Sequence, residues 1–387
     1  MKDEDKPSAG GASIPRHHAK DNLSEFDFIR KIRARARNRL QSTDSQTSSA
    51  FSPQSSSLLV GIGDDAAVFR ESEGRNTLIS TDLLIEDIDF HRDTTTPPYL
   101  GYKALAVSLS DIAAMGARPR WSLLSLGIPN DLWNSDFLDD FYAGFFTLAD
   151  RYDVSLVGGD LSRTPEKIVI DSAVLGHCAS GRAVRRSGAQ PGDQIFVTGS
   201  LGASAAGLRL LELGARVHQK SGSIDEAEAQ TIKQLLLRHL RPEPRVGWGL
   251  VLGDEALPTS MIDISDGLSS DLHHLCEESD SGAVVDAASI PIDPIVTEIC
   301  GRRALDPLLL ALHGGEDFEL LFTVSAANVA RLPRRVDGVP VTRIGEIRRP
   351  SEGVCLAEGA RVWALEPHGW QHFAGTEPLR ADAKKDV

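Results

Sequence analysis

The chain has 387 residues, 41% of them hydrophobic, which is enough for a core in each of two domains of similar size. Lys and Arg total 41 against 55 Asp and Glu, and the net charge of -14 argues against nucleic acid or an anionic membrane as a partner. No apolar run is long enough to span a membrane, and the polar first twenty residues predict no signal peptide. The cysteines form no CxxC pair and favour a reduced, cytoplasmic setting: Cys178, Cys276, Cys300 and Cys355.

Strands and helices alternate in the first half of the chain. Residues 1–21 are polar and rich in Gly, Ser and Lys, so we expect them to be disordered. A helix is predicted from Glu25 to Arg37, followed by a Ser/Thr/Gln-rich loop at 41–57. The pattern then predicts strands at 58–62, 77–80, 121–126, 154–157 and 167–176, with helices at 101–115 and 136–152.

A segment with three glycines and a proline at 181–193 is the best candidate for a domain boundary. After it, the pattern predicts strands at 194–198, 260–264, 283–286 and 318–324, with helices at 203–213, 230–240, 268–278 and 307–313. The sequence therefore predicts the α/β (α+β) class, with domains at 22–182 and 183–373 and a loose tail at 374–387.

Aspartates recur where a short apolar strand ends, beside Gly, Ser or Thr. Any one of them is equally well explained as a helix cap or a turn residue. Together they favour a shared Mg²⁺ site, because Mg²⁺ prefers carboxylate oxygens and would offset repulsion between the acids and bound phosphates. Since Asp64 and Asp65 are adjacent on an extended chain, one of them is expected to serve the backbone. The segments are Gly61-Ile-Gly-Asp-Asp65, Ser80-Thr81-Asp82, Gly158-Gly159-Asp160 and Asp263-Ile-Ser-Asp-Gly267, with Asp111 inside a predicted helix.

Three other segments each allow two interpretations. The glycines between Gly199 and Gly207 follow a strand and open a helix, which suits either a phosphate-binding turn or a tight connection. Arg185 and Arg186 would clamp a nucleotide phosphate or lie solvated in a linker. Glu316 follows a double glycine and would accept hydrogen bonds from an amino-bearing ligand, or simply flank a turn.

Nine motifs, taken in order, resemble those of the thiamine-monophosphate kinases, a family of the aminoimidazole ribonucleotide synthetase-like superfamily. The resemblance covers about residues 22 to 373, and the ordered set is far more specific than any single motif. The motifs are Gly61-Ile-Gly-Asp-Asp-Ala-Ala67, Ser80-Thr-Asp82, Lys103-Ala-Leu-Ala-Val-Ser-Leu-Ser-Asp-Ile-Ala-Ala-Met-Gly-Ala117, Val157-Gly-Gly-Asp160, Arg186-Ser-Gly-Ala189, Pro191-Gly-Asp193, His239-Leu-Arg-Pro242, Asp263-Ile-Ser-Asp-Gly-Leu268 and Gly314-Gly-Glu-Asp-Phe-Glu319.

The resemblance implies that ATP phosphorylates thiamine monophosphate to thiamine diphosphate, the last step of its biosynthesis, by in-line transfer assisted by several Mg²⁺ ions. It implies a homodimer in which the N-terminal domains share a β-barrel and each C-terminal domain is α/β. The implied metal ligands are Asp65, Ser80, Thr81, Asp82, Asp111, Asp160, Asp263 and Asp266, with Asp65, Asp263 and Asp266 catalytic. The implied ATP contacts are Gly159, Asp160, Arg186 and Ser265, and the implied substrate contacts are Asp89, Glu316 and Trp370.

One position departs from the family pattern. The family usually has a substrate-contacting His where this chain has Asp89, so Asp89 takes that contact, His91 takes it, or the contact is absent.

Sister enzymes are the first rival interpretation. Aminoimidazole ribonucleotide synthetase is disfavoured by the glycine-rich acidic segment and Trp370. Selenophosphate synthetase needs a reactive Cys near its start, but none precedes Cys178, and the hydrogenase-maturation carbamoyl dehydratase needs a C-terminal Cys, but the chain ends in Val387. A non-catalytic binder of nucleotide or thiamine diphosphate is the other rival, and the many metal-type acids argue against it.

Overall fold

The computed structural model describes residues 25–42, 57–71, 74–218 and 226–372. The disorder expected at 1–21, most of the loop expected at 41–57 and the tail expected at 374–387 lie outside these ranges. The first described element is helix α1 (Glu25–Ser42), which runs five residues beyond its expected end. Within the described ranges, no helix combines the length and apolarity needed to cross a membrane.

The first sheet has six strands in the order β1-β2-β3-β6-β4-β5. Its neighbours pair antiparallel, except that β4 and β5 are parallel. The edge strands β1 and β5 do not pair with each other, so this sheet is open rather than a closed barrel. The strands are β1 (Leu58–Val60), β2 (Ala67–Arg70), β3 (Arg75–Ile85), β4 (Arg118–Pro129), β5 (Ser155–Thr164) and β6 (Val169–Ala179).

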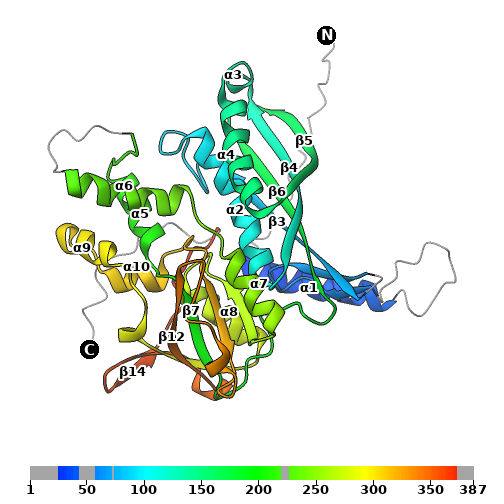
Figure 1. The fold of residues 1–387 in the computed structure, drawn as a ribbon, viewed down its shortest axis with the longest axis vertical. Coiled ribbons are helices and arrows are strands. Elements are labelled where there is room, and N and C mark those ends of the chain that lie inside the picture. The colour runs from blue at the N-terminus through cyan, green and yellow to red at the C-terminus, as the bar shows by residue number, and fades with distance from the viewer. Residues whose placement is uncertain (1–24, 43–56, 72–73, 219–225, 373–387) are drawn as a thin grey trace, which may run out of the picture.

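Two helices, α2 (Pro97–Ala114) and α4 (Phe137–Tyr152), lie along one face of this sheet (Figure 1). The short α3 (Asn130–Trp133) precedes α4. Helix α2 starts at a Thr96 cap followed by two prolines and is buried on nearly all sides, which explains its apolar sequence. Gly144 lets α4 approach α2 closely, because a Cβ there would meet the Pro98 carbonyl oxygen at 1.8 Å.

The second sheet has the order β14-β13-β9-β12-β7-β10-β8, with β11 beside β12. Only β13 and β9 pair in parallel. Its strands are β7 (Gln194–Thr198), β8 (Pro258–Asp263), β9 (Gly282–Asp286), β10 (Leu320–Val324), β11 (Arg335–Val336), β12 (Val339–Arg348), β13 (Val354–Glu358) and β14 (Arg361–Ala364). Its helices are α5 (Ala203–Glu212), α6 (Glu226–Leu240), α7 (Val246–Glu255), α8 (Leu268–Glu278), α9 (Pro294–Arg303) and α10 (Pro307–His313), with 3₁₀ turns at 287–289, 329–331 and 350–352.

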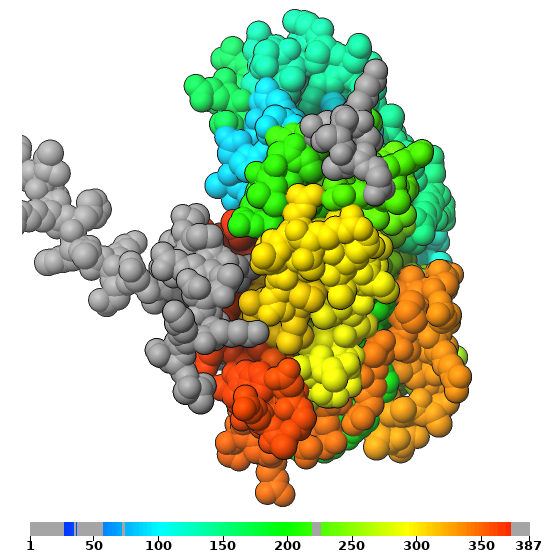
Figure 2. Space-filling view, turned by 90° about the vertical axis from the view of Figure 1, so that its left-hand side faces the viewer, coloured from blue at the N-terminus to red at the C-terminus, as the bar shows by residue number. Residues whose placement is uncertain are grey.

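The two sheets share one hydrophobic core. Helix α2 contacts both β8 and α7, and the side chains of Phe196 and Phe322 from the second sheet join the cluster that α2 buries. These two rings stack with centroids 5.7 Å apart. The halves therefore form one body, with the cyan to teal residues of the first half above the yellow to red residues of the C-terminal half in Figure 2. Residues from both halves meet where α2 faces β8.

Candidate active site

Three acids meet between the two sheets, two of them buried and Asp111 half-buried. Asp65 comes from the turn between β1 and β2, Asp111 from α2 and Asp263 from the end of β8. Each offers a carboxylate oxygen within 4.8 Å of those of the other two. The strand-end pattern thus correctly placed Asp65 and Asp263 together, and Asp111 joins them because α2 lies across both sheets.

Burial and mutual repulsion raise the pKa values of these acids. Burial, with Asp65 next, raises the pKa of Asp263 to about 7, and burial with Asp82 and Asp263 raises that of Asp111 well above its ordinary range. Oδ2 of Asp65 and Oδ2 of Asp82 are buried and accept no hydrogen bond from the described residues. Unpartnered carboxylate oxygens in a cluster of acids suit Mg²⁺, which prefers such ligands.

Strand β3 divides its predicted ligands between two faces of the sheet. Ser80 and Asp82 are directed toward α2, where the Ser80 hydroxyl donates to Asp111. Thr81 lies between them and is exposed on the opposite face, where its hydroxyl donates to Asp171 Oδ1 at 2.7 Å. The alternation of side chains along a strand therefore prevents the Thr81 side chain from joining Ser80 and Asp82.

Asp160 also lies away from the central acids. It is exposed on the edge strand β5 and pairs with Ser125, which pairs on its other side with Asp171. Residues paired across strands share a face, so Asp160, Asp171 and Thr81 all lie on the face away from α2. The preceding Gly159 has φ 152°, and a Cβ there would meet the Leu124 carbonyl oxygen at 1.9 Å, so the close approach of β5 and β4 requires glycine.

Arg186 lies half-buried beside the acids instead of being fully solvated. Its Nε donates to Asp65 Oδ1 at 3.0 Å, and Nη2 contacts the same oxygen. Its backbone N–H donates to Asp64 Oδ1 at 3.2 Å, and the Asp65 N–H donates there as well. This confirms the expectation that one of the two adjacent aspartates serves the backbone. Although burial opposes it, the charge of Asp65 raises the pKa of Arg186, which stays cationic.

A second acidic group lies at the start of α8. Ligand atoms of Asp266, Asp271 and His274 all lie within 4.8 Å of one another. Asp271 Oδ2 also accepts the N–H groups of Asp266 and Gly267, at 3.2 and 3.0 Å. Neither Asp271 nor His274 was among the ligands predicted from the sequence. The available signal was spacing, because Asp271 and His274 are three residues apart on one face of a helix that starts just after Asp266.

Two side chains from different helices, Lys103 and His239, contact the Glu316 carboxylate. The Lys103 ammonium lies 2.7 Å from Oε1 and 2.8 Å from Oε2, and His239 Nδ1 lies 3.0 Å from Oε2. Burial opposes ionisation of Glu316, but Lys103 and then His239 outweigh it and lower its pKa to about 2. The Glu316 N–H donates to the Ser265 carbonyl oxygen at 2.7 Å, which places this acid beside the Asp266 group.

The other predicted substrate residues lie around Glu316. Asp89 accepts the Ile85 N–H at 2.7 Å, and its pKa is raised by burial, while Glu316 raises it further. Trp370 is half-exposed, and its backbone N–H donates to the Asp266 carbonyl oxygen at 3.0 Å. His91 instead faces Asp87, with Nδ1 3.3 Å from Oδ1, on the exposed surface. Asp89 and His91 were the two candidates for the substrate contact that the family usually makes with a His, and Asp89 is the one near Glu316.

The glycine turn before α5 is not open to phosphate. Asp317 Oδ2 accepts the Gly202 N–H at 2.7 Å, and Oδ1 accepts the Ser204 N–H at 3.1 Å, so its carboxylate occupies the helix N-terminus. The interpretation as a phosphate-binding turn was wrong, and the tight connection was right. Glu319 is also structural, because Arg245 Nε donates to its Oε2 at 2.5 Å inside the core.

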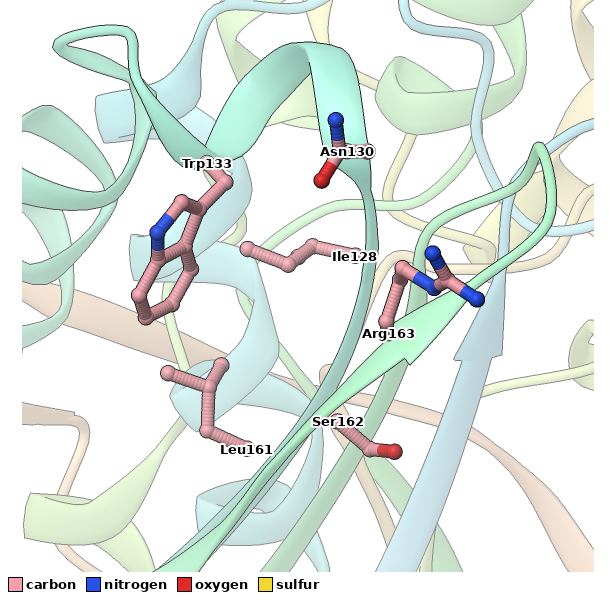
Figure 3. A pocket seen from close by; sticks show the side chains of 6 residues that line it. All are labelled: Ile128, Asn130, Trp133, Leu161, Ser162 and Arg163. Carbon is pink, nitrogen blue, oxygen red and sulfur yellow. The ribbon is translucent and has the colours of Figure 1, made fainter.

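A separate hollow lies at the far end of β5. It measures about 270 Å³ and is walled by Ile128, Trp133 and Leu161, which point toward one another, with Asn130, Ser162 and Arg163 around them (Figure 3). It begins one residue beyond Asp160 on the same strand.

Two family models together match most of the chain. AIR synthase related protein, N-terminal domain, matches residues 63–178, and AIR synthase related protein, C-terminal domain, matches residues 190–355. Among curated relatives, the thiamine-monophosphate kinase of Escherichia coli (strain K12) is 41% identical over 322 residues, covering 81% of this chain and 92% of the relative. That of Bacillus subtilis (strain 168) is 36% identical over 321 residues, covering 82% and 94%.

Solved structures show the same similarity. AaThiL complexed with AMPPCP and TMP has a TM-score of 0.75 at 30% identity, over 92% of this chain and all of that one. The thiamine-monophosphate kinase from Stenotrophomonas maltophilia K279a has a TM-score of 0.66 at 37% identity, over 82% of this chain and 94% of that one. The E. coli hydrogenase maturation protein HypE, at 17% identity and a TM-score of 0.55, shares the fold alone.

Proposed function

The chain belongs to the thiamine-monophosphate kinase family, and from that premise we propose how its residues transfer a phosphoryl group from ATP to thiamine monophosphate. It is a kinase that forms thiamine diphosphate, with the two-domain α/β fold of its relatives. Phosphoryl transfer needs positioning and charge neutralisation more than a covalent nucleophile. The cluster of Asp65, Asp111 and Asp263, in which Asp65 Oδ2 is buried without a hydrogen-bond partner among the described residues, is the observation that carries the proposal.

The metal ligands that we propose are the buried acids and their neighbours. Asp65, Ser80, Asp82, Asp111 and Asp263 would hold Mg²⁺ on the α2 side of the first sheet, and Asp266 would hold it at α8. Magnesium, when bound, supplies positive charge that neutralises both the acids and the phosphate oxygens between them. Thr81 and Asp160 would act from the opposite face of the sheet. Asp171 lies on that face beside both of them, so we add it to the proposed ligands.

ATP would lie along β5 and the acids. Gly159 brings the backbone of the edge strand close to the phosphates, and Ser265 lies next to Asp266. Arg186 would exchange part of its contact with Asp65 for a phosphate oxygen, because a guanidinium can serve both at once. The apolar walls of the hollow beyond Asp160 suit the adenine base.

Thiamine monophosphate would lie across the two sheets from Asp89 to Trp370. An oxygen of its own phosphate would attack the γ-phosphorus of ATP in line, with ADP as the leaving group, and Asp65, Asp263 and Asp266 would hold the Mg²⁺ that offsets the charge. Trp370 offers an exposed ring for stacking on the cationic thiazolium. Asp89 and Glu316 would accept hydrogen bonds from the amino-bearing ring.

We also propose that the chain forms a cytoplasmic homodimer with a boundary between domains at 182/183. The face of the first sheet away from α2 exposes large apolar side chains, and two such faces would close into a β-barrel. The residues concerned are Ile79, Leu83, Trp121 and Leu123. The two sheets, at 58–179 and 194–364, support the division into domains 22–182 and 183–373.

The experiment that tests the function mixes purified protein with ATP, MgCl₂ and thiamine monophosphate and follows thiamine diphosphate by chromatography. We expect product that disappears with EDTA and falls by at least about 100-fold in Asp266→Asn. Asp254→Asn changes an exposed acid of α7 and serves as the matched control. Binding of ATP without any product from the wild-type chain would refute the proposed reaction.

A further inference from the structure

Lys103 is a buried cation whose surroundings are specific. Its side chain is only 3% exposed, although it belongs to a residue type that is almost never fully buried unless paired. It extends from α2 and reaches both carboxylate oxygens of Glu316, at 2.7 and 2.8 Å. A single ammonium that bridges both oxygens fixes the plane of the carboxylate as well as its position.

His239 constrains the same carboxylate from a second direction. It lies buried near the end of α6, with Nδ1 3.0 Å from Glu316 Oε2 and 3.1 Å from Ser204 Oγ. A carboxylate only accepts hydrogen bonds, so Nδ1 must carry the proton that it donates to Glu316. With Oε2 contacted by both Lys103 and His239, Oε1 retains the greater capacity to accept a further donor.

The backbone at Glu316 is held in an unusual conformation. Its φ of 63° is left-handed, which is uncommon for a residue other than glycine and is kept only where surrounding contacts enforce it. The preceding Gly315 lies against the Ser265 carbonyl oxygen, which a Cβ would meet at 2.6 Å. The contacts with Lys103 and His239 help to hold this conformation. The Glu316 side chain is still 26% exposed, so a ligand can reach it.

We propose that Lys103 and His239 are positioning residues for substrate binding, which hold the Glu316 carboxylate in one orientation with Oε1 directed at the thiamine part of the substrate. This inference rests on the proposed function. Lys103 also offsets the charge of Glu316, whereas Asp89 is a second acid close enough to Glu316 for the two charges to repel. Glu316 then supplies a directed acceptor, and Asp89 supplies attraction for a cationic ring.

The experiment measures KM for thiamine monophosphate and for ATP separately. We expect Lys103→Met and His239→Leu each to raise KM for thiamine monophosphate by about 10- to 100-fold and to leave KM for ATP within about two-fold. His239→Asn keeps a donor near Nδ1 and should recover most of the loss. Lys167→Met removes a lysine from a surface pair with Asp87 and is the matched control.

A double-mutant cycle separates positioning from general destabilisation. In a Glu316→Gln background, His239→Leu should add little further increase in KM for thiamine monophosphate, because its effect passes through the missing carboxylate. Independent, additive effects would overturn the inference, as would equal increases in both KM values or unchanged values in the variants. A wild-type chain that forms no thiamine diphosphate would instead refute the proposed function.

Discussion

Asp263 shows the cost of gathering acids in one buried place. Burial, then Asp65, raises its pKa to about 7 from an ordinary 3.8, so the folded chain holds this proton more tightly than the unfolded chain. The free energy of unfolding therefore falls as the pH rises from about 4 to about 7. For this group the loss is at most about 4 kcal/mol, because one pKa unit corresponds to about 1.4 kcal/mol.

We therefore expect the metal-free chain to melt at a higher temperature at about pH 5.5 than at about pH 8. In EDTA, Asp263→Asn should reduce that difference, and excess MgCl₂ should stabilise the wild type more at the higher pH, where the carboxylates are ionised. Scanning calorimetry measures each midpoint. Equal melting midpoints at both pH values in EDTA would contradict a raised pKa of Asp263 in the folded chain.

Asp89 and His91 can be separated by substitution. Asp89 lies near Glu316, whereas His91 pairs with Asp87 at the surface. We expect Asp89→Asn to raise KM for thiamine monophosphate by roughly 10-fold or more, because a hydrogen bond to a charged acceptor contributes about 1.5–3 kcal/mol. His91→Gln should change it little, and steady-state kinetics decide. A larger effect at His91 would reverse the assignment.

At the scale of elements, strand ends were predictable and side-chain directions were only partly so. The sequence predicted the position of aspartates that follow apolar strands, because the residue after a buried strand lies at the edge of the core, where the site is. The period of two along β3 was not applied to Ser80, Thr81 and Asp82, although it sends Thr81 to the other face. The alternation of side chains along β3 could be predicted from the sequence, but the residues that each side chain contacts could not.

Contacts between distant elements were the part that sequence could not supply. Lys103 and His239 meet Glu316 from α2 and α6, which no spacing along the chain predicts. Helices α7 and α9 were not predicted, and α7 carries Trp248 into the shared core. Asp317 received no separate role from the sequence, because only the folded chain places it at the start of α5.

The cap on α5 is itself testable. Asp317 accepts two N–H groups at the helix start, so Asp317→Ala should destabilise the chain by about 1–2 kcal/mol, as loss of a helix cap does. KM for ATP should stay within about two-fold, since this turn holds no phosphate. Denaturant unfolding and kinetics measure the two effects. A large rise in KM for ATP with unchanged stability would restore the phosphate-binding interpretation.

For the whole molecule, the open face of the first sheet is the feature that a single chain leaves unexplained. Trp121 is 46% exposed there and Leu123 is 40% exposed, while the polar row of Thr81, Asp171 and Asp160 runs beside them. A large exposed apolar face of this kind marks an interaction site. If two copies meet on it, each copy's Asp160 faces the partner, and activity depends on assembly.

We expect Trp121→Glu to convert a dimer into monomers, because it places a charge in the middle of the apolar face. Light scattering after gel filtration measures the mass, and the same fractions are assayed for thiamine diphosphate. Trp363→Glu introduces the same change at an exposed Trp on β14 and should leave the mass unchanged. A Trp121→Glu monomer with full activity would show that the acids need no partner, whereas a wild-type monomer would remove the barrel from the proposal. Loss of mass together with loss of turnover would instead place the ATP site across two copies of the first sheet.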